Sequence, residues 1–170
     1  MRNLIRIIAV FLFVGITTAV SAQTPKFGHI DLQALIQVMP ERASAETQFN
    51  AFQSDLEDIF GEMQKDLQTK MMEFEALGAD ASEIKRNAKV SEIQDMQQRI
   101  QNYQQTANAQ LQQKQTELLK PVFDKAEAAI GEVAKEKGLL YVFDIGSKVV
   151  LYKSNESVDV LPLVRTKLGI

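Results

Sequence analysis

A long stretch without helix breakers constrains this chain more than any other feature. From about Glu41 to about Glu136 there is no proline before Pro121 and almost no glycine. Apolar residues recur there at every third or fourth position, which predicts one narrow apolar stripe along a helix. The outgoing half carries Phe49, Phe52, Leu56, Ile59, Met63, Leu67, Met71, Phe74 and Leu77, and the return half carries Ile93, Met96, Ile100, Tyr103, Ala107, Leu111, Leu118 and Val122.

The midpoint of this stretch contains a turn signal. Gly78 can end one helix, and Asp80 or Ser82 can begin the next. We therefore predict an antiparallel helical hairpin with its tip near residues 78–83. Arms of about 35 to 40 residues, at about 1.5 Å per residue, would extend roughly 50–60 Å. A compact domain of this size does not need such length, so we expect the function to depend on what the hairpin contacts.

The first 22 residues have the pattern of a cleaved signal peptide. Arg2 and Arg6 precede an apolar run over residues 7–20, and small residues follow at Ser21-Ala22, so the mature chain is expected to begin at Gln23. The alternative is an uncleaved membrane anchor, but a membrane span needs about 20 apolar residues. No cysteine follows to carry a lipid. We expect an exported, soluble protein.

Charge and cysteine content exclude two classes of function. Removing Arg2 and Arg6 from the 19 basic residues leaves 17 against 22 acidic residues, a net charge of −5 for the mature chain. General nucleic-acid binding needs a basic surface, so this acidity argues against it. The chain has no cysteine, which excludes disulfides and thiol chemistry.

Short elements flank the hairpin and predict a small body. The expected elements are strands at 26–30, 139–143 and 149–152, helices at 32–39 and 160–168, and a turn at 144–148. Asp31 and Asp159 are expected to cap the two short helices. Pro40 should end or kink the first of them, and Pro121 should kink the return helix. Gly138 should cap that helix.

These elements predict an α+β fold with a long antiparallel coiled-coil hairpin that projects from a small β-rich body. We expect a single domain over residues 23–170. The body comprises residues 26–48 and 121–170, and the arm comprises residues 49–120.

A body of this size suggests association. Its core is small and three short strands leave apolar edges open, which is marginal for a monomer. A self-sufficient monomer whose own helices cover both sheet faces is the alternative. We favour a closed symmetric assembly of bodies. The candidate oligomerisation residues are Phe27, Ile30, Leu35, Tyr141, Val142, Phe143, Val149, Val150 and Leu151.

No catalytic constellation is apparent. His29 is the only histidine, and a lone histidine in a short strand is more often structural than catalytic. No phosphate-binding glycine loop and no metal-ligand spacing occurs, and Asp144 before Gly146 and Ser147 is ordinary turn chemistry. We expect no enzyme activity, no cofactor and no metal.

The arm carries the main functional signal, because flexible methionines suit surfaces that accept many shapes. Most apolar arm residues are explained by packing of one helix on the other. Met72 and Phe60 lie off the predicted stripe and are therefore the better candidates for contacts outside the hairpin. The full set of candidates for binding a client protein is Phe60, Met63, Leu67, Met71, Met72, Phe74, Leu77, Ile84, Met96, Ile100 and Tyr103.

Three segments resemble the Skp (OmpH-like) family of periplasmic chaperones. The resemblance is carried by residues 27–41 at the start of the body, by 118–144 where the chain returns to the body, and by 150–169 at the end. It implies a homotrimer whose arms surround a cavity that holds unfolded outer-membrane proteins in the periplasm, without ATP. One departure is that family arms are strongly basic, whereas this mature chain is acidic. We do not infer a lipid-binding site from the resemblance, and we expect at most transient contact with a membrane surface.

Two hypotheses follow. The first is a holdase for exported, membrane-destined polypeptides, and the second is an envelope scaffold or adaptor whose hairpin docks one fixed protein partner.

Overall fold

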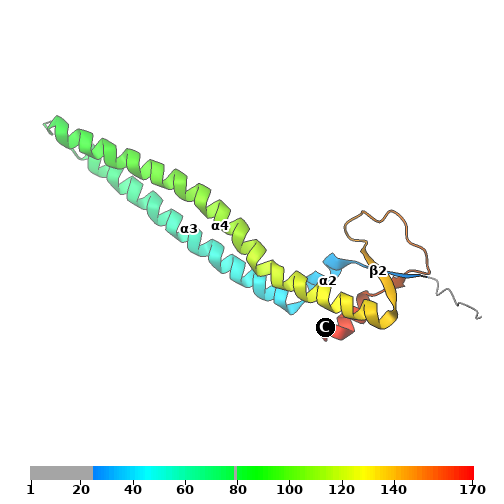
Figure 1. Cartoon of the computed structure of the whole chain (residues 1–170). Coiled ribbons are helices and arrows are strands. Elements are labelled where there is room, and N and C mark those ends of the chain that lie inside the picture. Colours follow the sequence, from blue (N-terminus) through cyan, green and yellow to red (C-terminus); the bar gives the residue numbers. More distant parts are fainter. Residues whose placement is uncertain (1–24, 79) are drawn as a thin grey trace, which may run out of the picture.

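The computed structural model describes residues 25–78 and 80–170, and it shows a long helical hairpin on a small body (Figure 1). The predicted signal peptide, residues 1–22, lies outside the described residues. The elements in chain order are β1 (Lys26–Ile30), α2 (Leu32–Val38), α3 (Pro40–Glu75), α4 (Glu83–Lys137), β2 (Leu139–Asp144), β3 (Val158–Asp159) and α5 (Leu161–Leu168). The mixture of long helices and a small sheet confirms the predicted α+β class.

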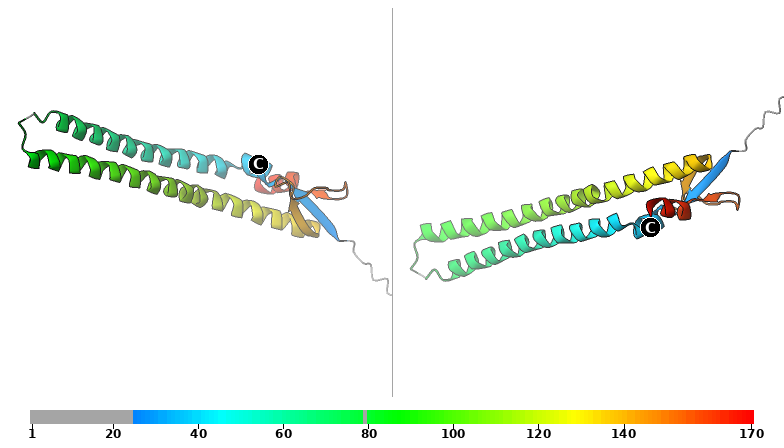
Figure 2. Two further views of the ribbon diagram at one scale, coloured as in Figure 1. Left: turned by 90° about the horizontal axis from the view of Figure 1, so that it is seen from above. Right: turned by 90° about the horizontal axis from the view of Figure 1, so that it is seen from below.

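The arm consists of α3 and α4, which run side by side in opposite directions in both views of Figure 2. α3 has 36 residues and is therefore about 54 Å long. α4 has 55 residues and continues through Pro121 into the body without a break. Its ribbon bends where the colour changes from green to yellow (Figure 1), so the helix changes direction between arm and body.

Two helix ends in the body follow the predicted capping residues, but the prediction for α5 is wrong, because its N-cap is Val160 and not Asp159. Asp31 is the N-cap of α2, and its Oδ1 accepts a hydrogen bond from the Ala34 N–H at 2.8 Å. α2 ends at Val38, directly before Met39 and Pro40, and Pro40 opens α3. Gly138 caps α4 with a φ of 62°, a conformation that glycine adopts without strain.

The tip differs from the prediction. α3 already ends at Glu75, with Ala76 at the C-cap, so Gly78 lies in the turn and does not end the helix. Ser82 occupies the N-cap position of α4 but its side chain makes no capping hydrogen bond. The Arg86 guanidinium instead donates to the Gly78 carbonyl at 2.8 Å and ties the turn to α4.

The sheet has the order β2-β1-β3, and both pairings are parallel. The predicted strand at 149–152 is wrong. Residues 145–157 form a loop, called loop 145–157 below, and the third strand is Val158–Asp159. A parallel partner of β1 needs a crossover rather than a tight turn, and the loop provides this crossover to the other edge of β1. The prediction failed because residues 149–152 have the β-branched composition of a strand although they lie on a loop.

One face of the sheet and the helices α2, α4 and α5 enclose the core. Its members are Ile30, Leu35, Ile36, Met39, Val122, Ala126, Ala129, Val133, Val160 and Val164. Gly28 lies at a close approach within this layer, because a Cβ at this position would be 2.7 Å from Leu139 Cδ1 and 3.3 Å from the Val158 carbonyl oxygen. An alanine at position 28 would therefore require the Leu139 side chain to move and the Val158 carbonyl to give slightly.

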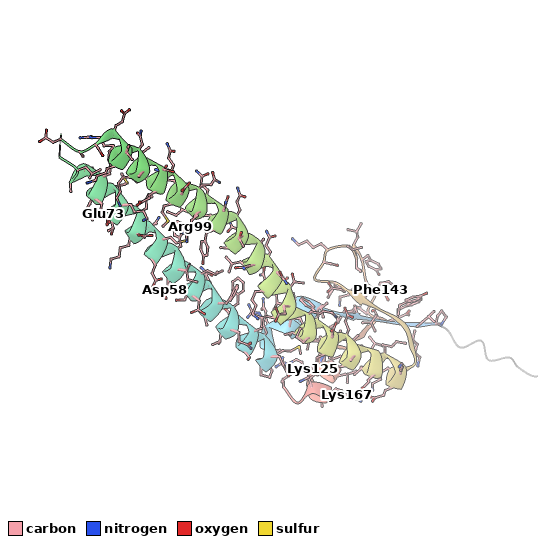
Figure 3. The ribbon with its side chains drawn as sticks, turned by 60° about the vertical axis from the view of Figure 1, so that its left-hand side comes forward. Asp58, Glu73, Arg99, Lys125, Phe143 and Lys167 are labelled. Atoms are coloured by element: carbon pink, nitrogen blue, oxygen red, sulfur yellow. The ribbon has the colours of Figure 1, made fainter. Side chains whose placement is uncertain are left out.

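Ion pairs connect the ends of the helices in the body. Lys125 on α4 pairs with Glu41 at the start of α3, and its hydrogen bond lowers the pKa of Glu41 below the ordinary value. Lys167 on α5 pairs with Glu132 at 2.9 Å and Glu136 at 2.6 Å. Figure 3 shows both lysines at the body end of the arm. These pairs fasten the arm and α5 to the body.

Candidate functional site

The packed face of the arm is spaced differently from the predicted stripe. From Ala45 onward, the buried or half-buried residues of α3 are Ala45, Phe49, Phe52, Leu56, Phe60, Met63, Leu67, Lys70 and Phe74. Two successive steps of four residues, from Phe52 to Leu56 and from Leu56 to Phe60, interrupt the alternation of threes and fours. Such an irregularity, called a stutter in coiled coils, rotates the packed face around the helix.

The stutter corrects the placement of Phe60. The sequence predicted Ile59 on the stripe and Phe60 off it, but Phe60 is half-buried and Ile59 is 45% exposed. The sequence alone could not show whether Ile59 or Phe60 follows Leu56 on the packed face, because both residues are apolar. Phe60 therefore belongs to the packing between the helices.

α4 has a matching irregularity, with two steps of four from Tyr103 to Ala107 and from Ala107 to Leu111. The two stutters face each other and leave a groove of about 460 Å³ between the helices. Its apolar lining comes from Leu56, Phe60, Tyr103, Ala107 and Leu111, and its polar lining from Gln53, Glu57, Gln104 and Asn108. The groove offers apolar surface to solvent on the side of the arm.

Tyr103 bridges the helices at this groove. Its hydroxyl donates to the Leu56 carbonyl oxygen of α3 at 3.0 Å. Met96 lies two turns closer to the tip and is 3% exposed, which makes it the most buried side chain of the arm portion of α4. These contacts fix the register of the two helices and leave Met96 little surface for another molecule, whereas Tyr103 also lines the groove.

The tip is the most exposed apolar part of the arm. Met71 and Met72 are both exposed, and Ile84 at the start of α4 is 82% exposed. Met63, Leu67, Phe74 and Ile100 are half-buried along the packed face, and Leu77 is half-buried in the tip turn. The structure thus divides the predicted client-binding residues: Met71, Met72 and Ile84 are open to solvent, and the others pack largely within the arm.

Charged residues take apolar positions in the packed face near the tip. Lys89 on α4 pairs with Glu73 of α3 at 2.8 Å and with Glu92 at 3.0 Å, and Lys70 of α3 pairs with Glu92 at 3.6 Å. Hydrogen bonds to Glu73 and Glu92 raise the pKa of Lys89, and the bond from Lys89 lowers the pKa of Glu92. Ion pairs therefore connect the helices where apolar contact is sparse.

Sequence reasoning missed this cluster because it followed apolar residues only. A signal was present, since Lys70 lies three residues after Leu67 and four before Phe74. The same spacing places Lys89 four residues before Ile93. A lysine at these positions of the heptad faces the partner helix.

The outer face of the body sheet carries three aromatic rings. Phe27 stacks on Tyr141 at a centroid distance of 6.3 Å, and Tyr141 lies 5.9 Å from Phe143. Tyr141 is 59% exposed, and Phe27 and Phe143 are exposed as well. Parallel sheets are normally covered on both faces, so this aromatic face, defined as Phe27, Tyr141 and Phe143, is unusually open. Figure 3 places Phe143 at the opposite end of the molecule from Glu73 near the tip.

The other predicted oligomerisation residues divide into two groups. Ile30 and Leu35 are buried in the core and Val142 packs against it, so their side chains serve the body itself and we do not keep them as interface candidates. Val149, Val150 and Leu151 lie on loop 145–157, where Leu151 is 96% exposed. Leu140 and Tyr152 are also exposed in this part of the body and were not among the predicted candidates.

The described residues contain no group of three or more histidine, aspartate or glutamate side chains that could hold a metal ion. No helix within residues 25–78 and 80–170 has the length and apolar character needed to cross a membrane. His29 is buried and hydrogen-bonded on both ring nitrogens, to Ser157 and to Lys153.

Comparisons with known proteins agree with this architecture. The family model described as "Outer membrane protein (OmpH-like)" matches residues 26–168. No curated protein sequence matches the chain. A crystal structure from Caulobacter crescentus CB15, provisionally described as an outer membrane chaperone (OmpH-like), has a TM-score of 0.72 at 11% sequence identity, over 85% of this chain and 84% of that one. At this identity, the structural likeness establishes the fold.

Proposed function

The chain belongs to the OmpH-like family, and on this premise we propose that it is a periplasmic holdase that binds unfolded outer-membrane proteins without ATP. The observation that carries the proposal is the position of the open apolar surface. Met71, Met72 and Ile84 are exposed at the far end of the arm, and the groove beside Phe60 opens along its side. A protein whose arm served only to hold its own helices together would not need apolar side chains at an exposed tip.

The chemistry of these surfaces suits unfolded chains. Methionine side chains adapt to many shapes, and the amides of Gln53, Gln104 and Asn108 at the groove can hydrogen-bond a peptide backbone. Full burial of one apolar side chain stabilises a complex by about 1.5–3 kcal/mol. One arm would therefore bind weakly, and release of the client would need no energy source.

Association would add the required affinity. We propose that three copies associate through the aromatic face and the apolar residues of loop 145–157. Phe27, Tyr141 and Phe143 leave one face of a parallel sheet uncovered in the single chain. Several arms around one client bind together through their effective concentration. The apolar surface of the body and that of the arm thus have separate roles.

An aggregation assay with matched variants tests the proposal. An unfolded outer-membrane β-barrel protein is diluted from urea and its turbidity is followed with and without this protein. We expect the wild type to suppress turbidity and the pair Met72→Glu and Ile84→Glu to suppress it less. The matched control is Gln68→Glu with Gln94→Glu, which adds the same charge at exposed polar positions of the arm.

Two results would count against the holdase. A wild type that leaves every barrel client to aggregate, while capturing one folded partner at a fixed ratio, would support the scaffold instead. Equal loss of activity in the tip variants and the control would assign the effect to charge rather than to Met72 and Ile84.

A further inference from the structure

His29 lies under loop 145–157 on the outer face of the sheet. It pairs with Phe143 in the parallel register and alternates with Gly28 and Ile30, so its side chain shares the face of Phe27 and Phe143. It is nevertheless only 4% exposed. Two loop residues cover it: Ser157 Oγ lies 2.8 Å from Nδ1, and Lys153 Nζ lies 2.8 Å from Nε2.

With Lys153 as an ammonium, the two contacts fit one arrangement of protons on the imidazole. The Lys153 ammonium has three donors and no acceptor, so Nε2 must accept and must carry no proton. The proton of the neutral ring is then on Nδ1, which donates to Ser157 Oγ. The arrangement requires a neutral His29. A protonated ring would place an N–H donor and a second positive charge against Lys153.

The loop has few other attachments. Among the hydrogen bonds and ion pairs of the described residues, only the two bonds to His29 connect residues 148–157 to the rest of the chain. Val149, Leu151 and Tyr152 are exposed and contribute little apolar burial. The position of the loop on the sheet therefore depends on the His29 side chain.

The other charged groups near His29 do not replace Lys153. On β3 the register partner of His29 is Asp159, whose Oδ1 accepts a hydrogen bond from the Leu161 N–H at 3.0 Å. On β2 the partner is Phe143, which carries no charge. The ammonium at 2.8 Å is thus the charged group in direct contact with the ring.

From these contacts we propose that His29 is a pH-dependent switch that holds loop 145–157 on the body at neutral pH and releases it when the imidazole is protonated. Histidine is the side chain that ordinarily changes charge between about pH 5 and 8. Release frees the part of the loop that carries the exposed apolar residues Val149, Leu151 and Tyr152 from its attachment to the sheet. If the loop contributes to the proposed trimer, acid should also weaken association, and this part of the inference rests on the proposed function. The release of the loop itself does not depend on it.

Hydrogen exchange measured by mass spectrometry on loop peptides tests the release. The His29 resonances, which are unambiguous because the chain has one histidine, report protonation by NMR. After correction for the intrinsic exchange rate, we expect the loop amides to exchange about tenfold faster at about pH 5.5 than at about pH 7.5. The reason is that a protonated ring loses its hydrogen bond with Lys153 and is repelled by the ammonium. A change of less than about twofold while His29 becomes protonated would overturn the proposal.

Three variants separate the switch from general destabilisation. His29→Gln keeps an acceptor and a donor but does not titrate, so the pH dependence should disappear. Lys153→Met should make the loop exchange rapidly at both pH values. Lys148→Met changes a lysine of the same loop that is not bonded to His29 and should behave as the wild type. An unchanged pH dependence in His29→Gln would also overturn the proposal.

The same exchange measurement on Tyr141→Ser, which removes a ring of the aromatic face without placing a charge beside His29 and should weaken association, separates this inference from the proposed assembly. Faster loop exchange in acid in that variant supports the switch whether or not the wild type is a trimer. A wild-type mass that stays constant while the loop is released would overturn the link to association.

Discussion

The stutter at Leu56 and Phe60 gives the sharpest prediction about the arm, because two neighbouring residues should behave in opposite ways. Phe60 is half-buried between the helices, whereas Ile59 is 45% exposed. Phenylalanine to alanine in a full core costs about 3–5 kcal/mol, so a half-buried ring should cost about 2 kcal/mol. Alanine is also the better helix former by about 0.5 kcal/mol, which reduces the expected cost of Phe60→Ala to about 1.5 kcal/mol.

Ile59→Ala should change the free energy of unfolding by less than about 0.5 kcal/mol, because little buried surface is lost and helix propensity is gained. The assay is urea denaturation followed by far-UV circular dichroism. With an m-value of about 2 kcal/mol/M, Phe60→Ala should lower the midpoint by about 0.7 M and Ile59→Ala by less than about 0.3 M. Equal costs, or a larger cost for Ile59→Ala, would refute the stutter and restore the regular stripe.

Three further predictions concern the tip, the sheet and the association surface. The hydrogen bond from Lys89 lowers the pKa of Glu92, so the stabilisation from this pair is present above the ordinary carboxyl pKa of 4.5 and is lost as the pH falls through the lowered value. Amide hydrogen exchange in residues 70–92 should therefore become faster in acid, in Glu92→Gln and in about 1 M salt, where the Debye length is about 3 Å. A tip whose exchange is insensitive to all three changes would contradict the ion-pair cluster. Gly28→Ala should lower stability by about 1–3 kcal/mol, because the added Cβ meets Leu139 and the Val158 carbonyl; an unchanged urea midpoint would show that the sheet can shift. If the proposed trimer forms, Phe143→Glu should convert it to monomers in light scattering, while Lys148→Glu at an exposed position should leave the mass unchanged; equal masses for both variants would contradict the aromatic face as the interface.

The sequence predicted those features that depend on one dominant local signal. The hairpin, the caps at Asp31 and Gly138 and the position of β2 each follow from periodicity or from a residue with a strong conformational preference. The class of the fold follows from these elements together.

Features that depend on tertiary contacts were not predictable. The 149–152 run has strand composition, but the edge of β1 is occupied by Val158–Asp159, and only the completed sheet shows this. The choice of Phe60 over Ile59 depends on where α4 lies. Ile30 and Leu35 were plausible interface residues until the packing of α2 and α4 against the sheet placed them in the core.

The candidate site was predictable in outline only. Met71, Met72 and Ile84 were all candidates from the sequence, but only Met72 was predicted to lie off the stripe, and the structure shows that all three are exposed. The aromatic face required the parallel register of β1 and β2, which brings Phe27 beside Tyr141. The cluster of His29, Lys153 and Ser157 joins residues more than 120 positions apart and leaves no local signal.

The most direct test of the account is the molecular mass in solution, measured by light scattering for the protein alone and after dilution of an unfolded outer-membrane barrel protein into it. The account predicts three chains per particle alone and a discrete soluble complex of this trimer with one client. A monomer, or an oligomer that remains at its own mass while the client aggregates, would contradict it.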